Sequence, residues 1–181
     1  MRRRRRSAAA EERLRQRRLR AATPEGRLRT ARLVCGAFLL FPAVFIAVGL
    51  AYVERPGVRG ASAVEIALAV LFGALALALL ASAGTLRDRM ARVAIAQRRA
   101  GSAAYVSDGA LYAAFATSSI AGFLVVETAS LLGFVGTVLA RSMLPVLGVA
   151  VVSYGLWAYL WPRAGVWRRW ADQAGSGGEE A

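Results

Sequence analysis

The sequence predicts an all-α membrane protein with four transmembrane helices in two hairpins and with both termini in the cytoplasm. Two observations predict this fold. First, four apolar segments carry at most one charged residue each, and each reaches the roughly 20 residues that a helix needs to cross about 30 Å of hydrocarbon. Second, almost all basic residues lie in the tails and the loop that four such segments would place on the same side of the membrane.

The composition excludes an ordinary soluble domain. The 181-residue chain is 57% hydrophobic with a mean hydropathy of +0.45, yet its formal net charge is +13. A soluble domain usually holds about 45–50% apolar residues. All 24 basic residues are arginine, and lysine, histidine and asparagine are absent. This usage, together with abundant alanine, indicates a GC-rich bacterial genome.

The chain begins with an arginine-rich tail, expected to be cytoplasmic, at residues 1–30. Such a tail beside a negatively charged leaflet gains up to about 1 kcal/mol per arginine. We therefore expect contact with anionic lipid headgroups, and we do not expect nucleic acid as a partner. A helix start at Thr23-Pro24, with an N-cap followed by proline, leads into the first span. The arginines assigned to lipid contact are Arg2, Arg3, Arg4, Arg5 and Arg6.

The transmembrane domain is expected at residues 31–163, followed by a cytoplasmic C-terminal tail at 164–181. Between the second and third spans, Leu86, Met90 and Val93 have helical spacing among arginines. This stretch is either an interfacial helix or an extension of the second span. The expected spans are 31–53, 62–83, 114–139 and 143–161.

The distribution of arginine predicts the orientation. Together with Arg32 and Arg163 at their borders, the two tails and the loop at 84–109 hold 21 of the 24 arginines, so the positive-inside rule places them in the cytoplasm of a bacterial inner membrane. Aromatic residues agree with this orientation, because they cluster where the fourth span leaves the bilayer. These residues are Tyr159, Trp161, Trp167 and Trp170.

The third span has a face of small residues that favours close helix packing. At about 100° per residue these residues fall on one side, and Glu127 falls on the opposite side with bulkier neighbours. The carboxyl is therefore expected to face either the remaining helices or another copy of the chain. The small face comprises Ala114, Ser118, Ala121, Gly122, Ala129, Gly133 and Gly136, and the neighbours of Glu127 are Ile120, Phe123, Leu131 and Phe134.

Pro42 lies near the middle of the first span. Proline has no backbone N–H, so the carbonyl of Phe38 loses its helical donor and a kink is expected. The kink is either merely tolerated or it offers this carbonyl to a polar side chain of another helix.

Glu127 is the candidate functional residue. It lies about 18 Å from either end of the third span, which is the depth of the bilayer midplane. An ionised carboxylate there costs at least about 2.5–3.5 kcal/mol, and every arginine lies in a tail or loop. We therefore expect a neutral Glu127 that donates a hydrogen bond. The expected acceptors are the Phe38 carbonyl, Ser153 and Tyr154.

The run from Phe123 to Gly136 resembles the carboxylate helix of rotary ATPase proteolipids, the c-type subunits, which carry a mid-membrane glutamate followed by small residues. It is also similar to small uncharacterised four-helix bacterial inner-membrane proteins with a Glu-x-x-x-x-x-Gly third helix and a Pro-Arg end to the fourth. Here these positions are Glu127, Gly133 and Pro162-Arg163. The first resemblance implies an ion-handling oligomer. The chain lacks the glycine-dense partner helix of a proteolipid.

The residue inventory limits the chemistry. The chain has no histidine and a single cysteine, so it offers no Cys/His metal cluster, histidine-based triad or disulfide framework. We expect neither metal nor cofactor and no enzymatic activity. The leading hypothesis is a non-enzymatic accessory, assembly or interaction subunit, either self-associated or in a larger membrane complex. The alternative is a proteolipid-like, proton- or ion-handling oligomer that uses Glu127.

Overall fold

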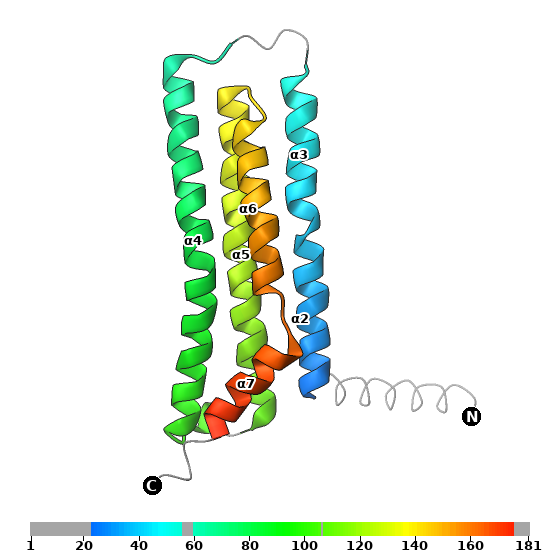
Figure 1. The fold of residues 1–181 in the computed structure, drawn as a ribbon, viewed down its shortest axis with the longest axis vertical. Coiled ribbons are helices and arrows are strands. Elements are labelled where there is room, and N and C mark those ends of the chain that lie inside the picture. Colours follow the sequence, from blue (N-terminus) through cyan, green and yellow to red (C-terminus); the bar gives the residue numbers. More distant parts are fainter. Residues whose placement is uncertain (1–22, 56–59, 106, 176–181) are drawn as a thin grey trace, which may run out of the picture.

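The computed structural model describes residues 23–55, 60–105 and 107–175. In these ranges every regular element is helical, and the long helices run side by side (Figure 1). The elements are α2 (Pro24–Phe38), α3 (Leu40–Val53), α4 (Ala63–Arg99), the short 3-10 helix η1 (Ala103–Tyr105), α5 (Asp108–Ala140), α6 (Leu144–Leu160) and α7 (Ala164–Gly175).

Three helical segments are long and apolar enough to cross a membrane, namely α2 together with α3, then α4, then α5. A fourth is obtained when α6 and α7 count as one span, bent by 53° at its break. By itself α6 has 17 residues. The chain is therefore a multi-pass helical membrane protein with three to four candidate spans.

The helix α5 is the central element, because it packs against α2, α3, α4 and α6. Figure 1 shows α2 and α3 stacked end to end beside it, with α7 lying across one end of the bundle. That end holds the start of α2, the end of α4, the start of α5, and α7; we name it the basic end. The opposite end, named the hairpin end, holds residues 54–55 and 60–62 of one connection and the turn at 141–143.

The N-termini of the long helices are capped by side chains that lie close to them in the sequence. Ser62 and Glu65 form a reciprocal capping box at the start of α4, in which the backbone N–H of Ser62 donates to Glu65 Oε2 at 2.6 Å. Ser107 caps α5 through the N–H of Ala110 at 3.2 Å. Glu65 also pairs with Arg141 at 3.2 Å, which links the two connections of the hairpin end.

The expected kink near Pro42 is a break between α2 and α3. The break falls at Leu39, three residues before the buried Pro42. Proline cannot donate a backbone hydrogen bond, so the turn before it is weakened. The hydroxyl of Tyr154 on α6 donates to the carbonyl of Leu39 at 3.4 Å. A side chain from another helix thus meets a carbonyl at the break, one residue beyond Phe38.

The small-residue face of α5 is the packing face against α4 and α6. A Cβ built on Gly133 would lie 2.9 Å from Val149 Cβ on α6, and one on Gly122 would lie 3.5 Å from the Ala83 carbonyl on α4. At Gly133 only glycine allows so close an approach, whereas at Gly122 an added Cβ would be in ordinary van der Waals contact. Five of the seven expected face residues are buried: Ser118, Gly122, Ala129, Gly133 and Gly136; Ala114 and Ala121 are half-buried.

The basic end has its own hydrophobic core. We name it the end cluster, and its largest member, Trp167, is 1% exposed. The sequence predicts Trp167 and Trp170 among aromatic residues at the lipid interface, and in the structure both rings pack edge-on or tilted against Phe115 of α5. The end cluster comprises Ala31, Ala91, Ala94, Ile95, Leu111, Phe115, Trp167 and Ala174.

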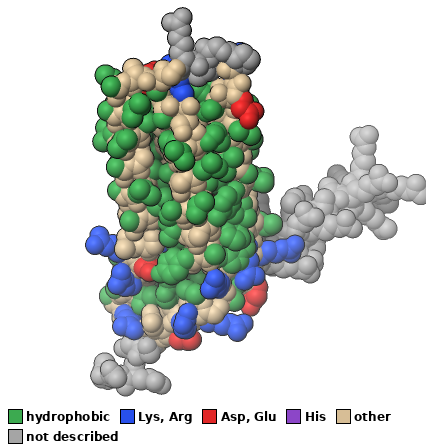
Figure 2. Space-filling view, turned by 45° about the horizontal axis from the view of Figure 1, so that its top comes forward, with side chains coloured by type: hydrophobic (Ala, Val, Ile, Leu, Met, Phe, Trp, Pro, Cys, Tyr) green, Lys and Arg blue, Asp and Glu red, His purple; other side chains and the backbone are tan. Residues whose placement is uncertain are grey.

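Two segments are more ordered than the sequence suggested. The stretch with Leu86, Met90 and Val93 continues α4 without interruption to Arg99, so it extends the second span. Residues Ala164–Gly175, expected in a tail, form the amphipathic helix α7, whose Trp167 and Ala174 are buried. Figure 2 shows the result at the surface, with arginine side chains gathered around the basic end and a largely apolar flank.

Candidate functional site

Glu127 lines a small cavity in the middle of the bundle, which we name the Glu127 cavity. Its volume is about 10 Å³, the space of about one water molecule. Three elements enclose it: the break between α2 and α3, the buried side of α5 next to Glu127, and one turn of α6. The lining residues are Leu39, Pro42, Phe123, Val126, Glu127, Ser153, Tyr154 and Trp157.

Two polar atoms of the residues lining this cavity lack a protein partner. Oε2 of Glu127 and Nε1 of Trp157 are buried, and neither makes a hydrogen bond within the described residues. Buried polar atoms are nearly always hydrogen-bonded, because an unpaired one costs about 1–3 kcal/mol. An indole N–H donates and a carboxyl oxygen accepts, and the cavity that both residues line has room for about one water molecule.

Ser153 and Tyr154 lie beside Glu127 in the structure, but their hydroxyl groups form hydrogen bonds with other residues. The hydroxyl of Ser153 lies 3.2 Å from that of Ser130, which donates to the Val126 carbonyl at 3.0 Å. Tyr154 uses its hydroxyl on Leu39, as described above. In the described part of the chain, neither Ser153 nor Tyr154 bonds to Glu127.

Phe38 contributes its ring beside the cavity. This ring stacks on Phe123 with centroids 6.5 Å apart. The carbonyl that receives a side-chain donor from another helix is that of Leu39, the residue after Phe38. The helix breaks at Leu39, and this position depends on the packing of α6 in addition to the location of Pro42.

Trp157 is the cavity residue that the sequence analysis missed. It lies four residues after Ser153 and three after Tyr154, so all three share one face of α6. This spacing on the fourth expected span is the feature of the sequence from which Trp157 could have been predicted as a neighbour of Glu127. Its ring packs on Trp161 with centroids 4.6 Å apart, which holds the indole beside the cavity.

No cation lines the Glu127 cavity. The Glu127 side chain is half-buried, and its neighbours in the cavity are apolar or neutral groups. The arrangement therefore suits a neutral carboxyl that exchanges a proton or holds a water molecule. It does not suit a charged carboxylate paired with arginine.

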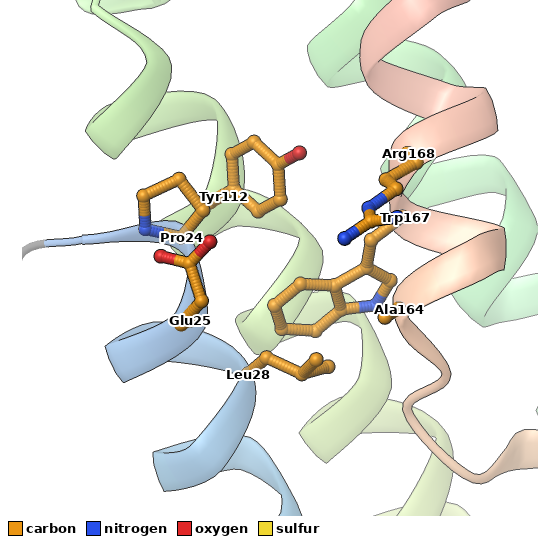
Figure 3. A pocket seen from close by; sticks show the side chains of 7 residues that line it. All are labelled: Pro24, Glu25, Leu28, Tyr112, Ala164, Trp167 and Arg168. Carbon is orange, nitrogen blue, oxygen red and sulfur yellow. The ribbon is translucent and has the colours of Figure 1, made fainter.

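A second pocket lies at the basic end, between α2, α5 and α7 (Figure 3). Its volume is about 60 Å³. Glu25 and Arg168 line it from opposite sides with Tyr112 near Glu25, and the indole of Trp167 forms its base. Both charged side chains are exposed, so they stay hydrated and leave the pocket with no fixed net charge.

Arginine side chains supply hydrogen bonds where α6 ends. The last carbonyls of a helix have no partner within it. Arg32 of α2 donates to the Pro162 carbonyl at 3.0 Å, and Arg87 of α4 donates to the Tyr159 carbonyl at 3.2 Å. Arg163 donates to the Ala158 carbonyl at 2.8 Å. These three arginines, which the sequence analysis treated only as an orientation signal, hold the break between α6 and α7.

Arg87 is the most buried of the charged side chains described, with 7% exposure. Its guanidinium lies over the rings of Tyr159 and Trp170, 4.8 and 5.7 Å from their centroids. It also pairs with Asp88 at 2.8 Å. Hydrogen bonds, an ion pair and two aromatic rings together offset the cost of burying this charge.

The described residues contain no cluster of three His, Cys, Asp or Glu side chains that could hold a metal ion. Cys35 is buried against the middle of the bundle. The lipid-contact arginines Arg2 to Arg6 lie outside the described residues. Comparison of the chain with protein-family models, curated proteins and solved structures finds no match.

Proposed function

We propose that this chain is a non-enzymatic accessory, assembly or interaction subunit of a bacterial inner membrane. It acts as a rigid bundle that supports other membrane proteins or further copies of itself. The observation that carries the proposal is the closed interior. The Glu127 cavity measures about 10 Å³, whereas pockets for small-molecule substrates usually measure about 300–1,000 Å³.

The packing of α5 supports this proposal. Gly122, Gly133 and Gly136 bring α5 against its neighbours at distances that leave no room for a methyl group at Gly133. Interiors packed in this way are stiff and do not deform continuously. A transport path through the bundle would have to separate these contacts.

The proposed arrangement has four spans in two hairpins, with the basic end in the cytoplasm. Residues Arg2 to Arg6 would then meet anionic headgroups of the cytoplasmic leaflet. A cysteine-accessibility experiment tests this orientation. In a chain with Cys35 replaced by serine, Ser102→Cys at the basic end should react with a reagent supplied from the cytoplasm. Ser142→Cys at the hairpin end should react only from outside. Labelling of Ser142→Cys from the cytoplasm would contradict the orientation.

The subunit role is tested by native electrophoresis of membranes dissolved in a mild detergent. The proposal predicts that the chain migrates in a discrete assembly, larger than its own monomer. Mass analysis then distinguishes an assembly with other proteins from one of several copies. Migration solely as a monomer in the native membrane extract would overturn the proposal.

A second candidate function is proton or ion handling by Glu127, in line with the resemblance to proteolipids. The observation that favours it is the pair of unpaired buried atoms, Glu127 Oε2 and Trp157 Nε1, beside a cavity of one water molecule. Ionisable side chains inside the membrane form proton relays in pumps and transporters.

A carboxyl-directed carbodiimide separates the two candidates. Such a reagent attacks a protonated carboxyl in an apolar site. Ion handling predicts selective labelling at Glu127 that declines as pH rises, and it predicts that Glu127→Gln abolishes both labelling and ion flux. A structural Glu127 predicts folded, assembled protein in Glu127→Gln and no flux in either form. Glu65, which lies near the hairpin end, provides an internal reference carboxyl.

A further inference from the structure

We propose that a groove between α4 and α6 binds one phosphatidylethanolamine molecule from the leaflet at the basic end. This groove, which we name the lipid groove, has a volume of about 400 Å³. It runs from Leu77 and Val152 in the apolar middle of the bundle to Asp88 and Tyr159 near the basic end. The inference does not depend on the proposed function.

The lipid groove has the length of one leaflet. Leu77 and Asp88 are eleven residues apart on α4, which corresponds to about 17 Å along the helix. Half of a bilayer core of about 30 Å is about 15 Å. The groove can therefore hold one acyl chain from the bilayer midplane to the level of the headgroups.

The walls of the groove face outward from the bundle. Leu77, Val152 and Tyr159 are 52%, 40% and 57% exposed. Gly84 lets the Tyr159 ring lie close against α4 near the polar end of the groove, since a Cβ there would lie 3.2 Å from Tyr159 Cε1. On a helix that crosses the membrane, an outward apolar groove of this kind is in contact with lipid chains, so an acyl chain is the occupant of fitting chemistry.

The polar end of the groove carries a carboxylate with one oxygen to spare. Arg87 contacts Asp88 through Nε and through a terminal nitrogen, and both bonds go to Oδ1, at 2.9 and 2.8 Å. Oδ2 has no hydrogen-bond partner within the described residues, and the Asp88 side chain is 36% exposed. This oxygen can accept a hydrogen bond from a primary ammonium group.

The next turn of α4 beyond Asp88 carries an exposed guanidinium. Arg92, one helical turn beyond Asp88, donates from Nε to the Asp88 carbonyl at 3.3 Å. Its two terminal nitrogens make no hydrogen bond within the described residues and can donate to a phosphate. A free carboxylate oxygen and free guanidinium donors one helical turn apart match a phosphoethanolamine headgroup, whose ammonium and phosphate are two carbons apart. Phosphatidylglycerol offers no ammonium to Asp88, and the choline group has no N–H to donate.

Native mass spectrometry of the purified full-length chain tests the proposal. The chain is equilibrated in detergent with equal amounts of phosphatidylethanolamine, phosphatidylglycerol and phosphatidylcholine of identical acyl chains. We expect about three- to tenfold more retained phosphatidylethanolamine than phosphatidylcholine, the worth of one exposed charge-assisted hydrogen bond. Stepwise N-methylation of the ethanolamine group should lower retention, most strongly at the last step, which removes the last N–H. Equal retention of the three lipids, or preference for phosphatidylglycerol, would overturn the proposal.

Variants then locate the site. Asp88→Asn should reduce the preference to near the phosphatidylcholine level, whereas Asp172→Asn on α7 should retain it. Arg92→Gln, which leaves the Arg87–Asp88 pair intact, should weaken retention of all three lipids, since each carries a phosphate. Ala81→Leu places a side chain in the groove and should lower retention of all three lipids. A preference that survives both Asp88→Asn and Ala81→Leu, or a rise in oligomer mass in place of lipid loss, would contradict the site.

Discussion

In the middle of the bundle the helices approach one another through glycine, alanine and serine, whereas at the basic end they are joined by tryptophan rings and arginine–carbonyl hydrogen bonds. The middle contains Gly133 against Val149 and the unpaired carboxyl of Glu127. The basic end contains Trp167 and the buried Arg87. The difference follows from the surroundings. Helices in lipid gain no hydrophobic free energy by packing together, so close van der Waals contact joins them, whereas apolar side chains near water are stabilised by burial.

The comparison teaches that arginine has two roles in this chain. Its distribution along the sequence predicts an orientation in the membrane, and at the basic end its side chains complete the hydrogen bonding of helix ends. Arg32, Arg87 and Arg163 all donate to carbonyls around the break between α6 and α7. The middle of the bundle needs no such donors except at the Leu39 break, where Tyr154 provides one.

The largest effect is expected from Trp167→Ala at the basic end. Removing this buried ring should lower the free energy of unfolding by about 3–5 kcal/mol, because it leaves a cavity among Phe115 and its neighbours. Unfolding in a mixed-detergent titration, followed by far-ultraviolet circular dichroism, measures the change. Val151→Ala, at a position 74% exposed on α6, is the control. Equal effects of the two substitutions would show that α7 does not stabilise the bundle.

In the middle of the bundle, Gly133→Ala should cost about 1–3 kcal/mol by overpacking. The added methyl would lie 2.9 Å from Val149 Cβ. The matched control is Gly148→Ala on α6, where nothing lies within 4 Å of the added carbon. Combining Gly133→Ala with Val149→Ala should recover part of the loss in the same titration. If the two single glycine variants are equally stable, α5 and α6 do not pack as described.

Arg87→Lys should destabilise the basic end by about 1–2 kcal/mol. Lysine keeps the charge but loses the planar donors that reach Asp88 and the Tyr159 carbonyl together. Arg89→Lys, an exposed position on the same helix, should leave the unfolding free energy nearly unchanged. An Arg87→Lys variant as stable as Arg89→Lys would remove the distinction between the structural arginines and the orientation signal.

Glu127→Gln should have the smallest effect, below about 1 kcal/mol. The amide has the shape of the carboxyl, and Oε2 makes no protein hydrogen bond that could be lost. The matched variant Trp157→Phe, which removes the other unpaired atom, should be similarly mild. Destabilisation of more than about 2 kcal/mol by Glu127→Gln would mean that the carboxyl has a partner within the bundle.

Local patterns made part of this fold predictable. The apolar segments, the Ser62 and Thr23 helix starts and the small face of α5 depend on residues close in sequence, and the structure has helices at each apolar segment. The helix α7 was not expected, because its burial depends on Phe115, some fifty residues away. The arginine bonds to helix ends span from 5 to 130 residues, so only one of the three is local.

Several residues of the candidate site could be predicted from the sequence, but their hydrogen-bond partners could not. Glu127 stood out by depth, and Pro42, Ser153 and Tyr154 do line its cavity. The bonds differ because Ser130 and Leu39 compete for the same hydroxyl groups. Competition of this kind depends on the rotation of α6 against α5, which no single-helix pattern specifies.

Proton flux in liposomes tests the central claim, that the middle of the bundle is a closed scaffold around Glu127. Purified chain and its Glu127→Gln variant are reconstituted at equal density, and a trapped pH-sensitive dye reports the decay of an imposed proton gradient with and without a membrane potential. The account predicts that both preparations retain the gradient as long as protein-free liposomes do. Rapid decay with the natural chain, abolished by Glu127→Gln, would contradict it and establish Glu127 as a proton site.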